Sequence, residues 1–168
     1  MKSKILLIPL ALLALSIVVP VMAKPAWYVE LQAEMTDFIF IGIVEEGMLF
    51  DVSFVGVAGG PNVKGGTVVG VDHVLIDWEG TAHLDVYYTI TDKEGDKISA
   101  WVTGLAVPKN PGQFVFENAW ATIIDQDDYP TTGKYIGLVG TTFRDEGFLT
   151  DVSVDPPGGY IHAKLYWD

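Results

Sequence analysis

Three residues with acid–base side chains alternate along one stretch of the chain. His83, Asp85 and Tyr87 occupy every second position of the segment 80–91, GTAHLDVYYTIT. Successive side chains of a β-strand point to opposite faces, so these three share one face, with neighbours about 7 Å apart. That spacing is too long for direct hydrogen bonds between short side chains, but it suits the lining of a pocket. The alternative is that the row forms the solvated face of an antiparallel sheet.

A further carboxylate, Glu117, interrupts a row of apolar residues formed by Val115, Ala119, Ala121 and Ile123. If this row faces the interior, burial raises the pKa of Glu117 and makes it a candidate general acid or base. If the row faces outward, Glu117 is a solvated charge. Together with the preceding strand, this pattern predicts three catalytic candidates, which are Asp85, Glu117 and His83.

Aromatic and polar residues on and around the same strand are candidates for binding a ligand. Aromatic rings supply a large apolar contact area, and Tyr and Trp add one polar atom. The expected ligand-binding residues are Asp72, His73, Tyr87, Tyr88, Trp101 and Trp120. The five tryptophans of the chain suit a packed core equally well, so the aromatic content does not separate a ligand cavity from a filled interior.

The sequence contains no recognisable metal or cofactor motif. The histidines His73, His83 and His162 lack close metal-ligand spacing. The acidic loops around Asp92 and Asp125 do not follow the EF-hand pattern. We therefore predict no cofactor and no dedicated metal site, with a zinc site assembled in three dimensions and weak calcium binding at the acidic loops as the alternatives.

These residues are carried by short β-strands separated by turn signals rich in glycine, proline and aspartate. The segment 38–44 is apolar throughout, which indicates a strand buried on both sides or a short helix. Strands are expected at 27–35, 38–44, 48–57, 68–78, 80–91, 98–107, 114–124, 135–143, 148–154 and 160–167. The pattern predicts an all-β fold, a single antiparallel β-barrel of nine or ten strands with little or no helix. We favour a barrel over a sandwich because closure leaves no exposed sheet edge.

One pattern resembles a known family. A turn at 59–61 precedes Asp72, the strand positions Gly80, Ala82, Leu84, Asp85, Tyr88 and Thr89, and then Gly95, Ile98 and Gly104; Gly133, Lys134, Tyr135 and Leu138 form a later part. This pattern resembles the small β-barrel proteins of the domain of unknown function 3237 family, which implies the fold but no settled activity. His73 stands where the family pattern has tryptophan, Tyr87 stands where it has arginine, and the family's later arginines are missing. An anionic ligand held by those groups is therefore not expected here.

A second likeness rests on residues 140–143, GTTF. They are similar to a segment of the barrels of allene oxide cyclases and dirigent proteins. This likeness implies a cavity that guides the ring closure or coupling of an apolar substrate.

The first 23 residues have the pattern of a secretory signal peptide. Lys2 and Lys4 precede an apolar run at 5–19, and Val21-Met22-Ala23 supplies a small-residue cleavage site. The run is shorter than the roughly 20 residues that span a bilayer. We expect cleavage after Ala23, a secreted or extracytoplasmic barrel domain at 24–168, and no membrane span after cleavage. The alternative is an uncleaved N-terminal anchor, because Pro25 lies close to the cut.

The chain is strongly acidic, with a formal charge of −12 that becomes −14 without Lys2 and Lys4. Nucleic acids and anionic lipids are bound through basic patches, so this balance argues against both as partners. The chain contains no cysteine, and its stability must come from its core and its sheet ladders. A homo-oligomer is compatible with these features.

The sequence therefore predicts an exported small β-barrel that binds a small, largely apolar or aromatic ligand in its interior. The first alternative is a cofactor-independent isomerase, cyclase or lyase that uses carboxylate, histidine or tyrosine groups of the cavity. The second is a structural or cell-surface protein with a filled barrel.

Overall fold

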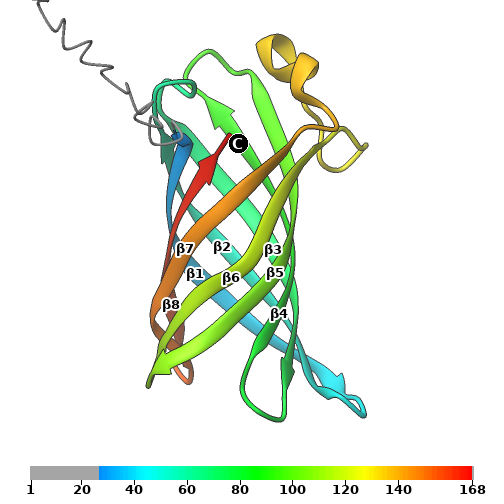
Figure 1. The fold of residues 1–168 in the computed structure, drawn as a ribbon, viewed down its shortest axis with the longest axis vertical. Coiled ribbons are helices and arrows are strands. Elements are labelled where there is room, and N and C mark those ends of the chain that lie inside the picture. Colours follow the sequence, from blue (N-terminus) through cyan, green and yellow to red (C-terminus); the bar gives the residue numbers. More distant parts are fainter. Residues whose placement is uncertain (1–26, 168) are drawn as a thin grey trace, which may run out of the picture.

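Alternating apolar side chains build eight long antiparallel strands, as seen in a computed structural model that describes residues 27–167. The predicted signal segment 1–23 lies outside the described residues. The strands are β1 (Trp27–Ile43), β2 (Gly47–Gly59), β3 (Gly66–Asp77), β4 (Ala82–Asp92), β5 (Lys97–Asn110), β6 (Gln113–Ile124), β7 (Thr142–Val154) and β8 (Pro157–Tyr166), with one 3-10 helix, η1 (Gly133–Leu138) (Figure 1). The expected all-β class with little helix is confirmed.

The strand number is eight, so the expected nine or ten is a small overestimate. Segments 27–35 and 38–44 form one strand, because a bulge between Met35 and Asp37 lets β1 continue past Thr36. Segment 135–143 is divided between η1 and the start of β7. The acidic triplet 145–147, which reads as a turn, lies inside β7.

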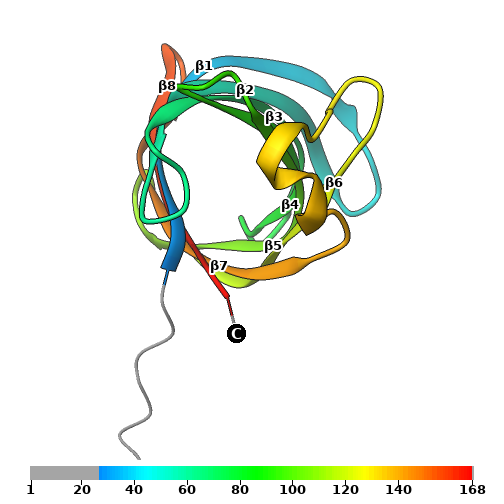
Figure 2. The ribbon, with the colours of Figure 1, turned by 90° about the horizontal axis from the view of Figure 1, so that it is seen from above.

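Each strand pairs with its neighbour in the chain, and β8 pairs with β1 to close the barrel. Figure 2 shows the resulting ring from above, with η1 over its rim. The β1–β8 ladder runs from Trp27↔Tyr166 to Glu34↔Tyr160. Beyond Glu34, the pairing of β1 within residues 27–167 is with β2 alone. The expected absence of an exposed edge therefore holds for only part of β1.

Two clusters of buried side chains line the interior of the barrel, and Val86, Phe116 and Ile161 pack against both. Large rings lie over glycines of neighbouring strands. The Phe54 ring covers Gly70 and the Phe116 ring covers Gly147, so closely that an added Cβ would lie 2.3 Å and 2.8 Å from the respective rings. Such small–large pairs fit the tight inner wall of an eight-stranded barrel.

The end of the barrel next to η1 is closed by Tyr135, which is 2% exposed and packs with the first cluster. Its hydroxyl donates to Oδ2 of Asp92 at 2.9 Å, and Lys134 pairs with the same carboxylate. The Lys134 ammonium lowers the pKa of Asp92 to about 2. These contacts fasten η1 to the β4–β5 turn.

Across the part of the chain that the structure describes, there is no helix long and apolar enough to traverse a bilayer.

Candidate ligand site inside the barrel

The central strand β4 turns its apolar row inward. Tyr88 and Ile90 are buried at 2% and 1% exposure, whereas His83 on the opposite row is exposed. This orientation follows from burial, because the row with more apolar area enters the core. The row with His83, Asp85 and Tyr87 therefore lies on the outer wall of the barrel.

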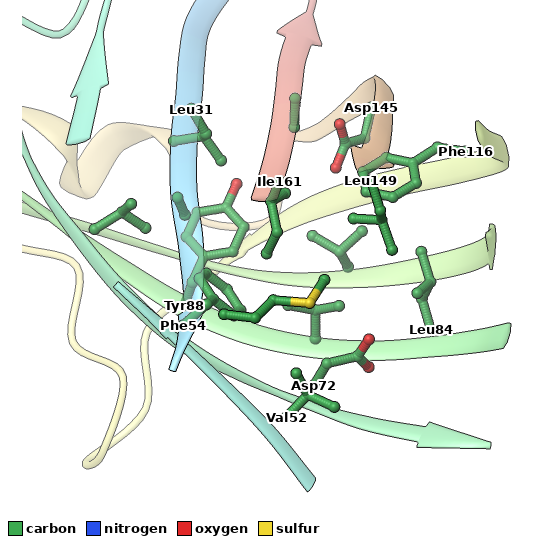
Figure 3. A pocket seen from close by; sticks show the side chains of 16 residues that line it. Leu31, Val52, Phe54, Asp72, Leu84, Tyr88, Phe116, Asp145, Leu149 and Ile161 are labelled. Atoms are coloured by element: carbon green, nitrogen blue, oxygen red, sulfur yellow. The ribbon is translucent and has the colours of Figure 1, made fainter. Parts of the chain in front are cut away.

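A cavity of about 60 Å³ lies inside the barrel, lined by residues of both core clusters. Its wall is mostly aliphatic and aromatic, with Leu31, Phe54, Leu84, Leu149 and Ile161 among its side chains (Figure 3). Three residues add polar atoms, namely Asp72, Tyr88 and Asp145. The cavity is larger than the 10–15 Å³ that one water needs and smaller than the roughly 300–1,000 Å³ of drug-sized pockets.

Asp72 enters the cavity from β3. Its Oδ1 accepts the backbone N–H of Asp85 at 3.0 Å, at a point where the β3–β4 register passes from Asp72↔Val86 to Leu75↔His83. Burial raises the pKa of the Asp72 carboxyl to about 7, although the Asp85 hydrogen bond acts in the opposite direction. Near neutral pH, this group is therefore divided between its acid and its carboxylate.

Asp145 enters the cavity from β7 and is 6% exposed. Burial raises the pKa of this carboxyl to about 7, and the charge of Glu146 adds to the effect. Its Oδ1 has no hydrogen-bond partner among the described residues. A buried carboxyl oxygen without a partner is unfavourable, and it is normally satisfied by water or by a ligand.

Tyr88 supplies the third polar group, and its hydroxyl also has no partner within residues 27–167. Burial raises the pKa of Tyr88, and the charge of Asp145 raises it further. Strands β3 and β7 are four positions apart in a ring of eight, so Asp72 and Asp145 come from opposite walls. Figure 3 shows both carboxyl groups on either side of the apolar cavity lining.

The three expected catalytic residues lie on the outer face. Nε2 of His83 is 3.0 Å from Oδ2 of Asp77, and Asp85 accepts the indole N–H of Trp101 at 2.7 Å. The side chain of Glu117 is 48% exposed, with Lys109 Nζ at 3.9 Å. The outer-face alternative therefore describes all three, and Glu117 is a solvated charge.

A bulge explains why Glu117 does not share the orientation of the apolar residues around it. The β5–β6 register shifts between Thr103↔Trp120 and Leu105↔Glu117, and Asn118 has a positive φ of 50°. The extra residue reverses the alternation, so that Phe116 and Ala119 line the interior while Glu117 faces out.

The expected ligand-binding residues divide between the two faces of the wall. Asp72 and Tyr88 line the cavity. The other four lie outside, where the Tyr87 ring is 6.1 Å from His73 and 6.4 Å from Trp101, and Trp120 is 43% exposed. Tyr129 joins this outer aromatic group, with its ring 5.2 Å from Tyr87.

Asp145 is a polar cavity residue that lies outside the sequence-based expectations. The triplet 145–147 has the composition of a turn, and this composition concealed a strand. The available signal was the row Phe143, Asp145, Gly147 and Leu149, which alternates in phase with the core.

Among the described residues, one acidic cluster has metal-ligand geometry, formed by Asp92, Glu94 and Asp96 with ligand atoms within 4.8 Å of one another. The Lys134 ammonium lies against all three carboxylates, at 4.0 Å or less. A lysine in this position supplies the positive charge that a cation would bring.

No protein-family model and no curated protein sequence matches this chain. Its fold is similar to that of a protein of unknown function from Clostridium acetobutylicum ATCC 824, with 14% identity, a TM-score of 0.64, and 86% of this chain and 100% of that chain covered. A conserved protein of unknown function from Rhodopseudomonas palustris has 14% identity and a TM-score of 0.62, covering 86% and 97%. A β-barrel-like protein from Acinetobacter baumannii AYE has 11% identity and a TM-score of 0.63, covering 86% and 96%. At such identities the likeness extends to the fold alone, a small β-barrel shared with uncharacterised proteins.

Proposed function

We propose that the barrel binds a small, mainly apolar molecule in its interior, held by hydrogen bonds to polar groups of the cavity wall. The observation that carries this proposal is a pair of buried atoms in a mainly apolar cavity, the Asp145 Oδ1 and the Tyr88 hydroxyl, which have no hydrogen-bond partner among the described residues. In a barrel with a purely structural role, these atoms would only lower the stability of the fold. Burying them costs desolvation free energy, and apolar residues of equal volume would not incur this cost.

The ligand must match both the size and the polarity of the cavity. At about 60 Å³ the cavity holds a molecule of few heavy atoms, and a larger one requires displacement of lining side chains such as Met35. Methionine has three rotatable bonds and repacks readily. The apolar wall favours aliphatic or aromatic carbon, and the opposed carboxyl groups favour a polar group at one or both ends of the ligand.

The charge of that polar group has a measurable consequence. An ammonium group favours the ionised carboxylates, so its affinity rises as pH increases through about 7, the pKa of Asp72 and Asp145. A neutral hydrogen-bond acceptor favours the protonated acids, so its affinity falls over the same range.

A thermal-shift screen tests this function, with small alcohols, phenols, aromatic acids and amines as the panel. A ligand at about 100 times its Kd stabilises the folded state by roughly 2.7 kcal/mol, which is a shift of several degrees. Ala163 lines the cavity, so Ala163→Leu is expected to abolish the shift. Trp101→Ala, on the outer wall, is the matched control and should keep it. A flat response of the unmodified protein to the whole panel supports the filled, structural barrel instead.

A second candidate function is cofactor-independent proton transfer, as in an isomerase, a cyclase or a lyase. It is favoured by two interior carboxyl groups whose pKa values of about 7 suit a general acid and a general base. Once a ligand is identified, exchange of its acidic C–H with D₂O, followed by NMR, separates catalysis from binding. Exchange that is lost in Asp145→Asn supports the enzyme, and binding without exchange supports a carrier.

The expectation that His83, Asp85 and Glu117 take part in catalysis stays a prediction, although all three lie on the outer face of the barrel. We also propose kinship with the domain of unknown function 3237 family, supported by the small closed β-barrel that the resemblance implies. We also propose that the protein is exported, on the basis of the signal-peptide pattern in its first 23 residues.

A further inference from the structure

The hairpin formed by the end of β1 and the start of β2 extends past the closed part of the barrel, at the lower right of Figure 1. Residues 36–43 of β1, called here the β1 edge, follow the last β1–β8 pair at Glu34↔Tyr160. On the β8 side, this edge has no strand partner among the described residues. A strand edge of this kind presents backbone N–H and C=O groups ready to pair with another strand.

From Phe38 onward, the β1 edge is apolar on both faces. Ile39, Phe40, Ile41 and Ile43 are 49%, 54%, 55% and 68% exposed. Phe40 pairs with Phe50 on one face, where their rings are 5.5 Å apart, and Ile39 pairs with Asp51 on the other. The sequence of this segment is typical of a strand buried on both sides, yet the single chain leaves it exposed on both.

The usual protections of an exposed edge are sparse here. Natural edges carry lysine, proline or inward charges, whereas residues 38–44 contain neither a charge nor a proline. A bulge between Phe40 and Gly42 is the one such device in this segment. The hairpin is held in position, because the Trp78 indole donates to the carbonyl of Glu45 at 2.8 Å.

We propose that the β1 edge pairs antiparallel with the same edge of a second copy of this chain, forming a two-fold symmetric dimer. An antiparallel pair of identical strands is self-complementary, because each outward N–H meets a C=O of the partner strand. Pairing also covers the same apolar side chains of both copies in one step.

The charge distribution favours a second copy over a membrane. Carboxylates stand at both ends of the edge, at Asp37 and at the tip residues Glu45 and Glu46, and the whole chain has a formal charge of −12. An anionic lipid surface repels such a hairpin. In the self-paired dimer, the uncharged segment 38–44 forms the centre of the contact. Asp37 of each copy then lies near the tip carboxylates of the other, so added salt, which screens this repulsion, should strengthen the dimer.

Cysteine cross-linking tests the pairing directly, because the chain has no cysteine of its own. Ile41→Cys, at the centre of the proposed contact, should give a disulfide-linked dimer under mild oxidation. Val57→Cys is the matched control, since Val57 is 58% exposed on β2 away from the edge, and it should stay monomeric. Equal cross-linking of both variants overturns the proposal.

Light scattering coupled to size-exclusion chromatography gives the second measurement. The unmodified protein should show twice the monomer mass, in a proportion that grows with concentration. Ile41→Lys places two like charges across the two-fold contact and should give monomer, whereas Val57→Lys should keep the dimer; circular dichroism checks that both variants are folded. Monomer at all concentrations, a dimer that survives Ile41→Lys, or monomer bound to phosphatidylcholine vesicles overturns the proposal.

Discussion

At the scale of single residues, Asp145 combines burial, a raised pKa and an oxygen that has no hydrogen-bond partner within residues 27–167. The pKa of this carboxyl rises from an ordinary value of 3.8 to about 7 in the folded protein. Between these two values the folded state binds more protons than the unfolded state. The free energy of unfolding therefore falls as pH rises through this interval. The contribution of protonated Asp145 to stability is fully present only below about 3.8.

We expect Asp145→Asn to remove part of this pH dependence. The amide carries no charge, so the variant should gain stability relative to the unmodified protein as pH rises from about 4 to about 8. Urea denaturation at a series of pH values measures the effect. Asp151→Asn is the matched control, because Asp151 is an exposed aspartate of the same strand. A difference between wild type and Asp145→Asn that is constant with pH contradicts the buried-carboxyl interpretation.

Some residues of the candidate site can be predicted from the sequence, and others cannot. Tyr88 is found from the alternation of the β4 segment, since the more apolar row turns inward, whereas Asp72 on β3 is found from its place in the resemblance pattern. The orientation of Glu117 cannot be found in this way. Strict alternation assigns it to the row of Ala119 and Ile123, and a one-residue bulge at Asn118 reverses that assignment.

At the scale of elements, the β6 bulge sets which side chains reach the cavity. Gly104 on β5 lies against it, and a Cβ built on Gly104 would lie 2.5 Å from Cα of Ala119. The φ of Gly104 is +157°, which disfavours other residues. The absence of a side chain at this position therefore allows β5 and β6 to approach closely beside Phe116.

We expect Gly104→Ala to destabilise the fold by about 1–3 kcal/mol, because both the contact and the backbone conformation are unfavourable for alanine. Gly59→Ala is the matched control in β2, since a Cβ there meets nothing within 4 Å. Chemical denaturation of the two variants gives the comparison. Equal stability of the variants means that the β5–β6 contact relaxes without loss.

The closure of the barrel end by η1 gives a second prediction for an element. Lys134→Ala should lower the melting temperature at neutral pH, because it removes the cation that lowers the pKa of Asp92 to about 2. The stabilisation from Asp92 is present above its ordinary pKa of 3.8 and is lost as pH falls towards 2. The difference between variant and wild type should therefore narrow in acid.

Lys109→Ala is the control for this experiment. Lys109 lies 3.9 Å from Glu117 at an exposed position, where ion pairs contribute little. Its melting temperature should match that of the wild type across the pH series. A loss for Lys109→Ala equal to that for Lys134→Ala attributes the effect to the general charge balance of the chain instead of to the η1 contact.

At the scale of the whole molecule, the barrel class follows from regular alternation and frequent turn signals, which survive errors in individual segments. The number of strands does not follow from these signals, because a bulge joins 27–35 to 38–44 and a turn-like triplet lies within β7. Both errors have one cause. Composition reports local preference, whereas pairing with neighbouring strands decides whether a strand continues.

The N-terminal segment gives the chain as a whole a testable fate. We expect the exported protein to begin at Lys24, because Val21 and Ala23 supply the small residues of a cleavage site after the apolar run. N-terminal sequencing and intact mass of the protein recovered outside the cytoplasm measure the cut. Ala23→Leu should block cleavage but not export, whereas Leu12→Arg together with Leu13→Arg should retain the full-length chain in the cytoplasm by breaking the apolar run. A full-length wild-type chain in the membrane fraction favours the uncleaved anchor, and the barrel then acts at that membrane surface and not as a free protein.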